Sequence, residues 1–201
     1  MLARVAERTL EINRLHVVDP SKMSKRAYIN KYRDGVFECI DRCYSHLYGT
    51  VPFTETMKQQ IVDQFMMVLN KQYLIVICNE NEQVVAFALC LPAMGEAVQK
   101  SGGRLTPRTL IRLLRAVKHP RVIDLALVAV LPEYQSTGVN AVMLQTMQEQ
   151  LESGNVERFE TNLNLETNTA VMAQWKYFDA EQHKRRRSYI KKLTDNGVGK
   201  D

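Results

Sequence analysis

Residues 122–140 carry the sequence VIDLALVAVLPEYQSTGVN. The apolar run Val122–Val130 predicts a buried strand, which must end before Pro132 because proline has no N–H for a sheet ladder. The small residues at 135–140 then lead into a helix that we expect at residues 137–152. A strand, a glycine-containing turn and a helix N-terminus favour the binding of a pyrophosphate, because unpaired N–H groups and the positive end of the helix dipole face the anion.

The flanking segments supply the other elements of an α/β domain. Before the central strand we expect a short strand, two helices and a β-hairpin, and after its helix we expect a strand, a helix and a basic strand. A connection of some 30 residues separates the hairpin from the central strand, which is too long for an empty loop and contains a helix begun by Thr106 and Pro107. The expected elements before the central strand are a strand at 12–18, helices at 21–48 and 54–69, and hairpin strands at 73–78 and 84–91. Those after its helix are a strand at 158–163, a helix at 168–178 and a basic strand at 183–193.

Composition narrows the class of protein. The chain has 201 residues, 45% of them hydrophobic, which suits one domain with a substantial core. A formal net charge of +5 favours an anionic ligand without requiring nucleic acid. The four cysteines lack disulfide-framework spacing, no signal-peptide pattern begins the chain, and no run reaches the roughly 18 apolar residues of a membrane span. We therefore expect a soluble cytoplasmic protein with free thiols.

This element order, together with the turn, resembles the GNAT superfamily, the general-control-related N-acetyltransferases, over residues 12–193. The family's turn is Gln/Arg-x-x-Gly-x-Gly/Ala, and Gln135, Gly138 and Asn140 occupy its three positions, with Asn140 replacing a small residue. The resemblance implies a mixed, strongly twisted sheet flanked by helices, with a helical insertion at about residues 93–120.

The chain also resembles a GNAT-like group in which this domain is the C-terminal domain of larger proteins. The pattern of residues 1–11 indicates a helix with no obvious core role, and on this resemblance the alternative is a linker. Residues 194–201 are polar and are expected to form a flexible tail.

The resemblance implies an acyl-CoA-dependent N-acyltransferase, with acetyl-CoA or another acyl-CoA as the cofactor and an amine that attacks the thioester directly. In the family the central strand splays from its neighbour and binds the pantetheine arm as an added strand. The cofactor-binding residues carried over to this sequence are Ala129, Val130 and Leu131 beside that arm, Gln135, Ser136, Thr137, Gly138, Val139 and Asn140 at the pyrophosphate, and Asn168 at the start of a later family motif.

Two residues are candidates for proton transfer. Asp124 lies eleven positions before Gln135, where histone-type members of the family have a glutamate that acts as the general base, and burial would raise an aspartate pKa toward a useful range. The alternative is a structural carboxylate paired with a cation such as Arg121. In many relatives a tyrosine protonates the leaving thiolate. Here Trp175 stands at that position, and Tyr177 lies about 200° further round the helix.

A binding or regulatory module that holds CoA or another ligand is the alternative function, because Asn140, Trp175 and Asp179 depart from the family pattern. The expected partner is a small-molecule amine or a protein amine, and a homodimer is a further option. We expect no specific nucleic acid, no membrane and no metal. The basic run at residues 184–192 is interpreted either as a docking surface for anions or as a solvated edge strand that its charge keeps from aggregating.

Overall fold

The computed structural model describes residues 1–47, 50–153, 156–166 and 168–191, without the side chains of Ala170 and Tyr177. The chain forms two compact units, Met1–Thr161 and Asn162–Asp201. Within the described residues, no helix is long and apolar enough to cross a membrane.

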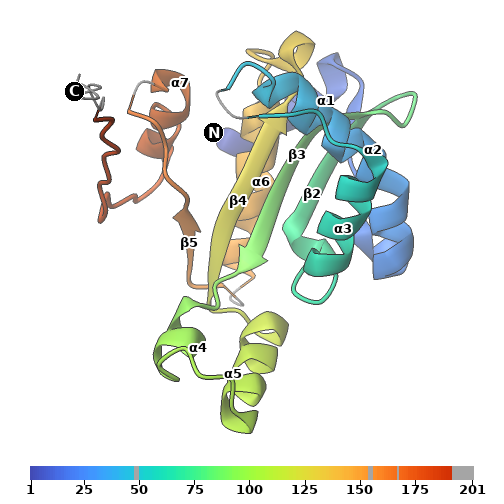
Figure 1. The fold of residues 1–201 in the computed structure, drawn as a ribbon. Helices are drawn as coiled ribbons and strands as arrows, with labels where there is room; N and C mark the ends of the chain where they lie inside the picture. The colour runs from blue at the N-terminus through green and yellow to red at the C-terminus, as the bar shows by residue number, and fades with distance from the viewer. Residues whose placement is uncertain (48–49, 154–155, 167, 192–201) are drawn as a thin grey trace, which may run out of the picture. The chain divides into compact units, whose positions relative to one another are not determined.

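The first unit is built on one mixed sheet (Figure 1). In the described residues it has five strands in the spatial order β1-β2-β3-β4-β5. Neighbours from β1 to β4 are antiparallel, and β4 and β5 are parallel, which confirms the predicted fold class. The strands are β1 (Leu15–Val17), β2 (Leu74–Asn79), β3 (Val84–Pro92), β4 (Val122–Val130) and β5 (Arg158–Thr161).

Helices cover both faces of this sheet, with α2 and α3 in front of it and α6 behind it in the view of Figure 1. The insertion between β3 and β4 forms α4 and α5 at one end of the sheet. Side chains of Ser24, Thr54 and Thr106 accept hydrogen bonds at the N-termini of α2, α3 and α5, as expected for N-cap residues. The helices are α1 (Leu2–Ile12), α2 (Lys25–Tyr44), α3 (Glu55–Phe65), α4 (Gly95–Gln99), α5 (Pro107–Lys118) and α6 (Val139–Glu152).

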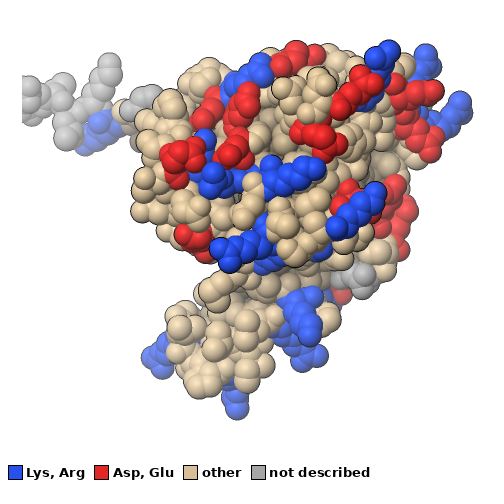
Figure 2. Space-filling model, turned by 90° about the vertical axis from the view of Figure 1, so that its right-hand side faces the viewer, with Lys and Arg blue, Asp and Glu red and all other residues tan. Residues whose placement is uncertain are grey.

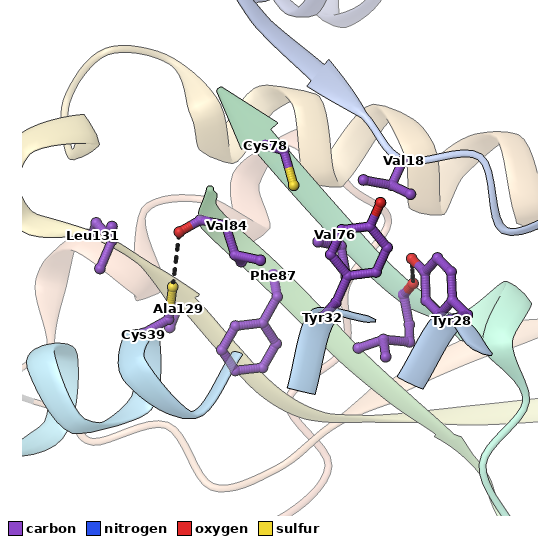
Figure 3. Packing of buried hydrophobic residues seen from close by; sticks show 11 residues of the cluster. Val18, Tyr28, Tyr32, Cys39, Val76, Cys78, Val84, Phe87, Ala129 and Leu131 are labelled. Atoms are coloured by element: carbon purple, nitrogen blue, oxygen red, sulfur yellow. Dashed lines mark hydrogen bonds between the residues drawn. The ribbon is translucent and has the colours of Figure 1, made fainter. Parts of the chain in front are cut away.

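A cluster of buried residues lies between α2 and the sheet (Figure 3). Tyr28 and Tyr32 of α2 are buried against strand residues that include Val76 and Phe87. The hydroxyl of Tyr28 donates to the carbonyl of Leu74 at 2.9 Å, so burial of the ring leaves no unpaired hydroxyl. This packing holds α2 across β2, β3 and β4 and thereby positions the C-terminal end of α2 near β4.

Helix α1 packs against α6, and its Ala6 and Thr9 are buried. The sequence pattern of this segment indicated helix without a core role. The contact matters below because α6 begins at the turn that follows β4.

The second unit contains α7 (Thr169–Met172) and a 3₁₀ turn (Trp175–Tyr177), so the helix expected at 168–178 is divided into two short pieces. The predicted strand at 183–193 is wrong for residues 183–191, which have no regular structure, and 192–193 lie outside the described residues. A strand requires a neighbouring strand for its hydrogen bonds. Instead, the guanidinium of Arg185 pairs with Glu166 at 2.6 Å.

Candidate functional site

Among the described residues, strand β4 has a neighbouring strand on both sides in its first half only. Its parallel ladder with β5 ends at the pair Leu125–Thr161, whereas its antiparallel ladder with β3 continues to Val130. The β3 register advances by one residue while β4 passes from Leu127 to Leu125, which makes Ala126 a bulge. Residues 127–130 therefore have a strand partner on the β3 side alone, within the described chain. We call their other side the open edge.

Backbone groups of Val128 and Val130 point to the open edge. The N–H of Leu131 donates to the carbonyl of Val85 on β3 at 2.9 Å. Because successive residues of a strand direct their N–H and C=O groups to opposite sides, Val128 and Val130 direct theirs away from β3. Of the three residues predicted beside a pantetheine arm, Val130 thus lies with its backbone on the open edge, while Ala129 and Leu131 face β3.

Three side chains already occupy the carbonyls of the open edge. The hydroxyl of Tyr44 donates to Val128 O at 2.6 Å, while the Cys43 thiol and the Gln135 amide donate to Val130 O at 3.1 and 3.0 Å. Burial raises the pKa of both Tyr44 and Cys43, which keeps them protonated as donors at neutral pH. With these carbonyls engaged, the edge presents the N–H groups of Val128 and Val130 to a ligand that offers acceptors.

The sequence indicated that Cys43 or Tyr44 continues the apolar face of α2, and the hydrogen bonds of both side chains to β4 were missed. A signal was nonetheless present, because a hydroxyl and a thiol at the end of an otherwise core-facing helix need a polar partner. Which carbonyls they reach depends on how α2 crosses the sheet.

The turn after β4 brings two left-handed residues together. Ser136 has φ 63° and Gly138 has φ 98°, and α6 starts at the next residue with Gly138 as its N-cap. The Thr137 hydroxyl donates to Tyr134 O at 2.7 Å, which connects the turn to the short 3₁₀ helix Pro132–Tyr134 that precedes it. Gly138 supplies no capping side chain, so the first N–H groups of α6 are available to an external anion.

The predicted turn residues differ in what they expose. Ser136 and Asn140 are solvent-exposed, whereas the side chain of Val139 is 1% exposed and belongs to the core. Val139 can therefore reach a ligand through its backbone alone. The amide of Gln135 is committed to β4, as described above.

Gly138 lies against α1. A Cβ atom at this position would come within 2.5 Å of the Thr9 hydroxyl oxygen, which is far shorter than a van der Waals contact. Thr9 is 5% exposed and has little room to move aside. The turn thus requires glycine for two reasons, its positive φ and the close approach of α1.

Asp124 lies at the opposite end of β4 and lines a cavity of about 530 Å³. It is partly buried, and it stands in register with Leu91 on β3 and Glu160 on β5. Glu160 lines the same cavity. The insertion closes the other side through residues of α4 and α5, so two carboxylates of the sheet face a space bordered by the insertion.

Two further predicted residues belong to the second unit. The side-chain oxygen of Asn168 accepts from Val171 N–H at 3.2 Å, which makes it the N-cap of α7. The side chain of Tyr177 lies outside the described residues. The indole N–H of Trp175 is buried with no hydrogen-bond partner among the described residues.

Comparison with known proteins agrees with this architecture. The model of the acetyltransferase (GNAT) family matches residues 33–178. No curated protein matches the chain. Among solved structures, AAC(6')-Ih, an aminoglycoside antibiotic 6'-N-acetyltransferase from Acinetobacter baumannii, has 14% sequence identity and a TM-score of 0.50 over 90% of this chain and 98% of that chain.

Two other solved structures have the same fold. AAC(6')-Iy, in complex with the bisubstrate analog CoA-S-monomethyl-acetylneamine, has 12% identity and a TM-score of 0.51 over 89% of this chain and 99% of that chain. A protein described as a possible acetyltransferase from Clostridium difficile 630 has 8% identity and a TM-score of 0.53 over 90% and 99%. At these identities the likeness concerns the fold, and it confirms the resemblance on which the fold prediction rests.

Proposed function

This chain belongs to the acetyltransferase (GNAT) family, and from that premise we propose that it transfers an acyl group from acyl-CoA to an amine. The predicted enzyme class, N-acetyltransferase, is that of the acetyltransferase (GNAT) family. The acetyl group is the acyl group proposed, and a small molecule is the proposed acceptor, since aminoglycoside acetyltransferases share the fold.

The observation that carries the proposal is the continuity of the open edge with the α6 N-terminus. An extended pantetheine chain needs backbone partners, and the N–H groups of Val128 and Val130 offer them in the manner of an added strand. The edge leads into the turn at Ser136 and Gly138, where the first N–H groups of α6 suit a pyrophosphate. One strand and the helix after it thus fit both parts of CoA.

When bound, acyl-CoA supplies an activated thioester. The chain contributes orientation, because a ligand along the open edge is held at a fixed register. Edge N–H groups stabilise negative charge on a carbonyl oxygen placed there. Asp124, directly or through water, would take the proton of the attacking amine, while the new C–N bond replaces the C–S bond and CoA leaves as its thiolate.

Ser136 provides a test of the pyrophosphate site. Ser136→Asp adds a negative charge at the start of α6, and Ser136→Asn adds the same shape without the charge; both side chains tolerate the left-handed region. We expect Ser136→Asp to weaken acetyl-CoA binding by about tenfold or more in calorimetry, because the new carboxylate repels the negatively charged pyrophosphate that would bind there.

Ser136→Asn is the control and should bind acetyl-CoA nearly as the unmodified protein does. A thiol-release assay with mixed amines measures transfer in parallel. Equal affinities for the Asp and Asn variants would argue against the pyrophosphate site. Binding without acyl transfer to any amine would contradict the transferase function.

A further inference from the structure

The cavity beside Asp124 is lined by charged side chains of both signs. Its sheet wall includes Asp124 and Glu160, from neighbouring strands. Its helical wall includes Arg112 and Arg115, both from α5 and both exposed to solvent. Figure 2 shows the end of the first unit that carries the insertion with Lys and Arg side chains on a largely uncharged surface, whereas acidic and basic side chains are intermixed over the rest of that face.

Ion pairs neutralise most of the other charges around the cavity. Lys100 pairs with Glu96, Arg158 pairs with Glu160 at 3.3 Å, and Arg121 pairs with Glu157 at 2.7 Å. The hydrogen bond and the charge of Lys100 lower the pKa of Glu96, and the charges of Arg121 and Arg158 lower it further. These three basic groups therefore act on the same carboxylate.

Arg112 and Arg115 are the exceptions. Neither forms an ion pair with a carboxylate in the described part of the chain. The nearest acceptor of Arg112 is the carbonyl of Lys100, 3.5 Å from its Nη1 atom. The positive charges of these two guanidinium groups are therefore available to pair with an anionic ligand. A guanidinium group binds carboxylate and phosphate through paired N–H donors.

We propose that this cavity binds an amine that also carries a carboxylate or phosphate, with the anionic group at Arg112 and Arg115 and the amino group at Asp124. The inference rests on the proposed function, because it identifies the class of acceptor. Arg112 and Arg115 on the insertion side and Asp124 on the sheet side correspond to the two ends of such a molecule. A volume of about 530 Å³ lies within the usual range for small-molecule sites.

Equilibrium binding tests this inference without depending on acyl transfer. Calorimetry compares phosphoethanolamine with ethanolamine, and β-alanine with propylamine, on the CoA-loaded full chain. Each pair shares the amine and differs in the anionic group, so the two arms separate phosphate from carboxylate recognition. We expect the anionic member of at least one pair to bind at least tenfold more tightly.

A matched pair of double variants assigns the preference to residues. Arg112→Gln/Arg115→Gln should remove the preference, whereas Arg108→Gln/Lys118→Gln, with the same charge change on exposed residues of α5 outside the cavity, should retain it. Circular dichroism confirms that both variants are folded. No preference in the unmodified protein, or equal losses in the two variants, would overturn the inference. Thiol release, measured separately, decides the transferase function.

Discussion

Gly138→Ala tests the contact between the turn and the N-terminal helix. The substitution places a methyl group in a residue with φ 98°, which costs roughly 1–2 kcal/mol for a residue with a Cβ atom. The same methyl would lie 2.5 Å from the hydroxyl oxygen of Thr9, and relief of such an overlap in a packed region costs typically about 1–3 kcal/mol. We therefore expect the free energy of unfolding to fall by about 2–4 kcal/mol, part of the loss being offset in the unfolded chain.

Thr9→Ala separates these two causes. It removes the hydroxyl and methyl groups that lie 2.5 and 3.5 Å from the added atom and leaves the Thr9 Cβ at 3.6 Å, an ordinary contact. In the Thr9→Ala background, Gly138→Ala should therefore cost only the backbone strain. The double-mutant cycle should give a coupling of about 1–3 kcal/mol, since the residues are in contact.

Urea unfolding of the four proteins measures this coupling, and calorimetry with acetyl-CoA reports whether the turn retains its shape. Gly102→Ala is the control, because Gly102 has φ 58° and open space around its would-be Cβ, so only strain applies. If Gly138→Ala costs the same with and without Thr9→Ala, the packing of α1 does not constrain the turn and the reasoning fails.

Three further predictions concern catalysis, packing and pH. Asp124→Asn should lower turnover by about 100-fold or more near neutral pH with acetyl-CoA affinity unchanged, while Glu160→Gln should lose little; equal losses would exclude Asp124 as the base. Gly35→Ala should lower stability in urea by about 1–2 kcal/mol, because its Cβ would lie 2.6 Å from Val84 Cγ2 and this overlap exceeds the gain of about 1 kcal/mol in helix propensity. Gly95→Ala, which meets no atom within 4 Å, is its control, and matching stabilities for the two variants would contradict the close approach. Burial raises the pKa of Cys90 to about 12, so the native chain keeps a proton that the unfolded chain loses from about pH 9. The free energy of unfolding should therefore fall as the pH rises from 9 to 12, and it should fall less steeply in Cys90→Ala. Identical slopes for the two proteins would refute this.

Local chemistry explains why β4 and its turn could be predicted well. The apolar run at Val122–Val130 coincides with the observed strand, and the break at Pro132 is the loss of one N–H donor. Gly138 was identified as a turn residue, and its positive φ is a property of the residue type. By contrast, the basic run near residue 185 was predicted to be a strand, and residues 183–191 have no regular structure.

Which backbone groups face the open edge could not be predicted from the sequence. The family resemblance pointed to residues 129–131 beside the ligand, but the N–H groups that face the edge are those of Val128 and Val130. Which residues face outward depends on the register with β3 and on the bulge at Ala126. Register is a relation between two strands and is absent from the sequence of either one.

The sequence by itself determined the order of elements from β1 to β5 and the strand–turn–helix that suits a pyrophosphate, because these follow from local periodicity and from the conformational limits of proline and glycine. The family was inferred from the resemblance of this order and of the turn to the GNAT pattern. The tertiary structure decided that Tyr44 engages an edge carbonyl, that Thr9 requires glycine at position 138, and that Arg112 and Arg115 share a cavity with Asp124. Those relations join residues distant along the chain. They arise only when packing brings α1 against α6 and the insertion against the sheet.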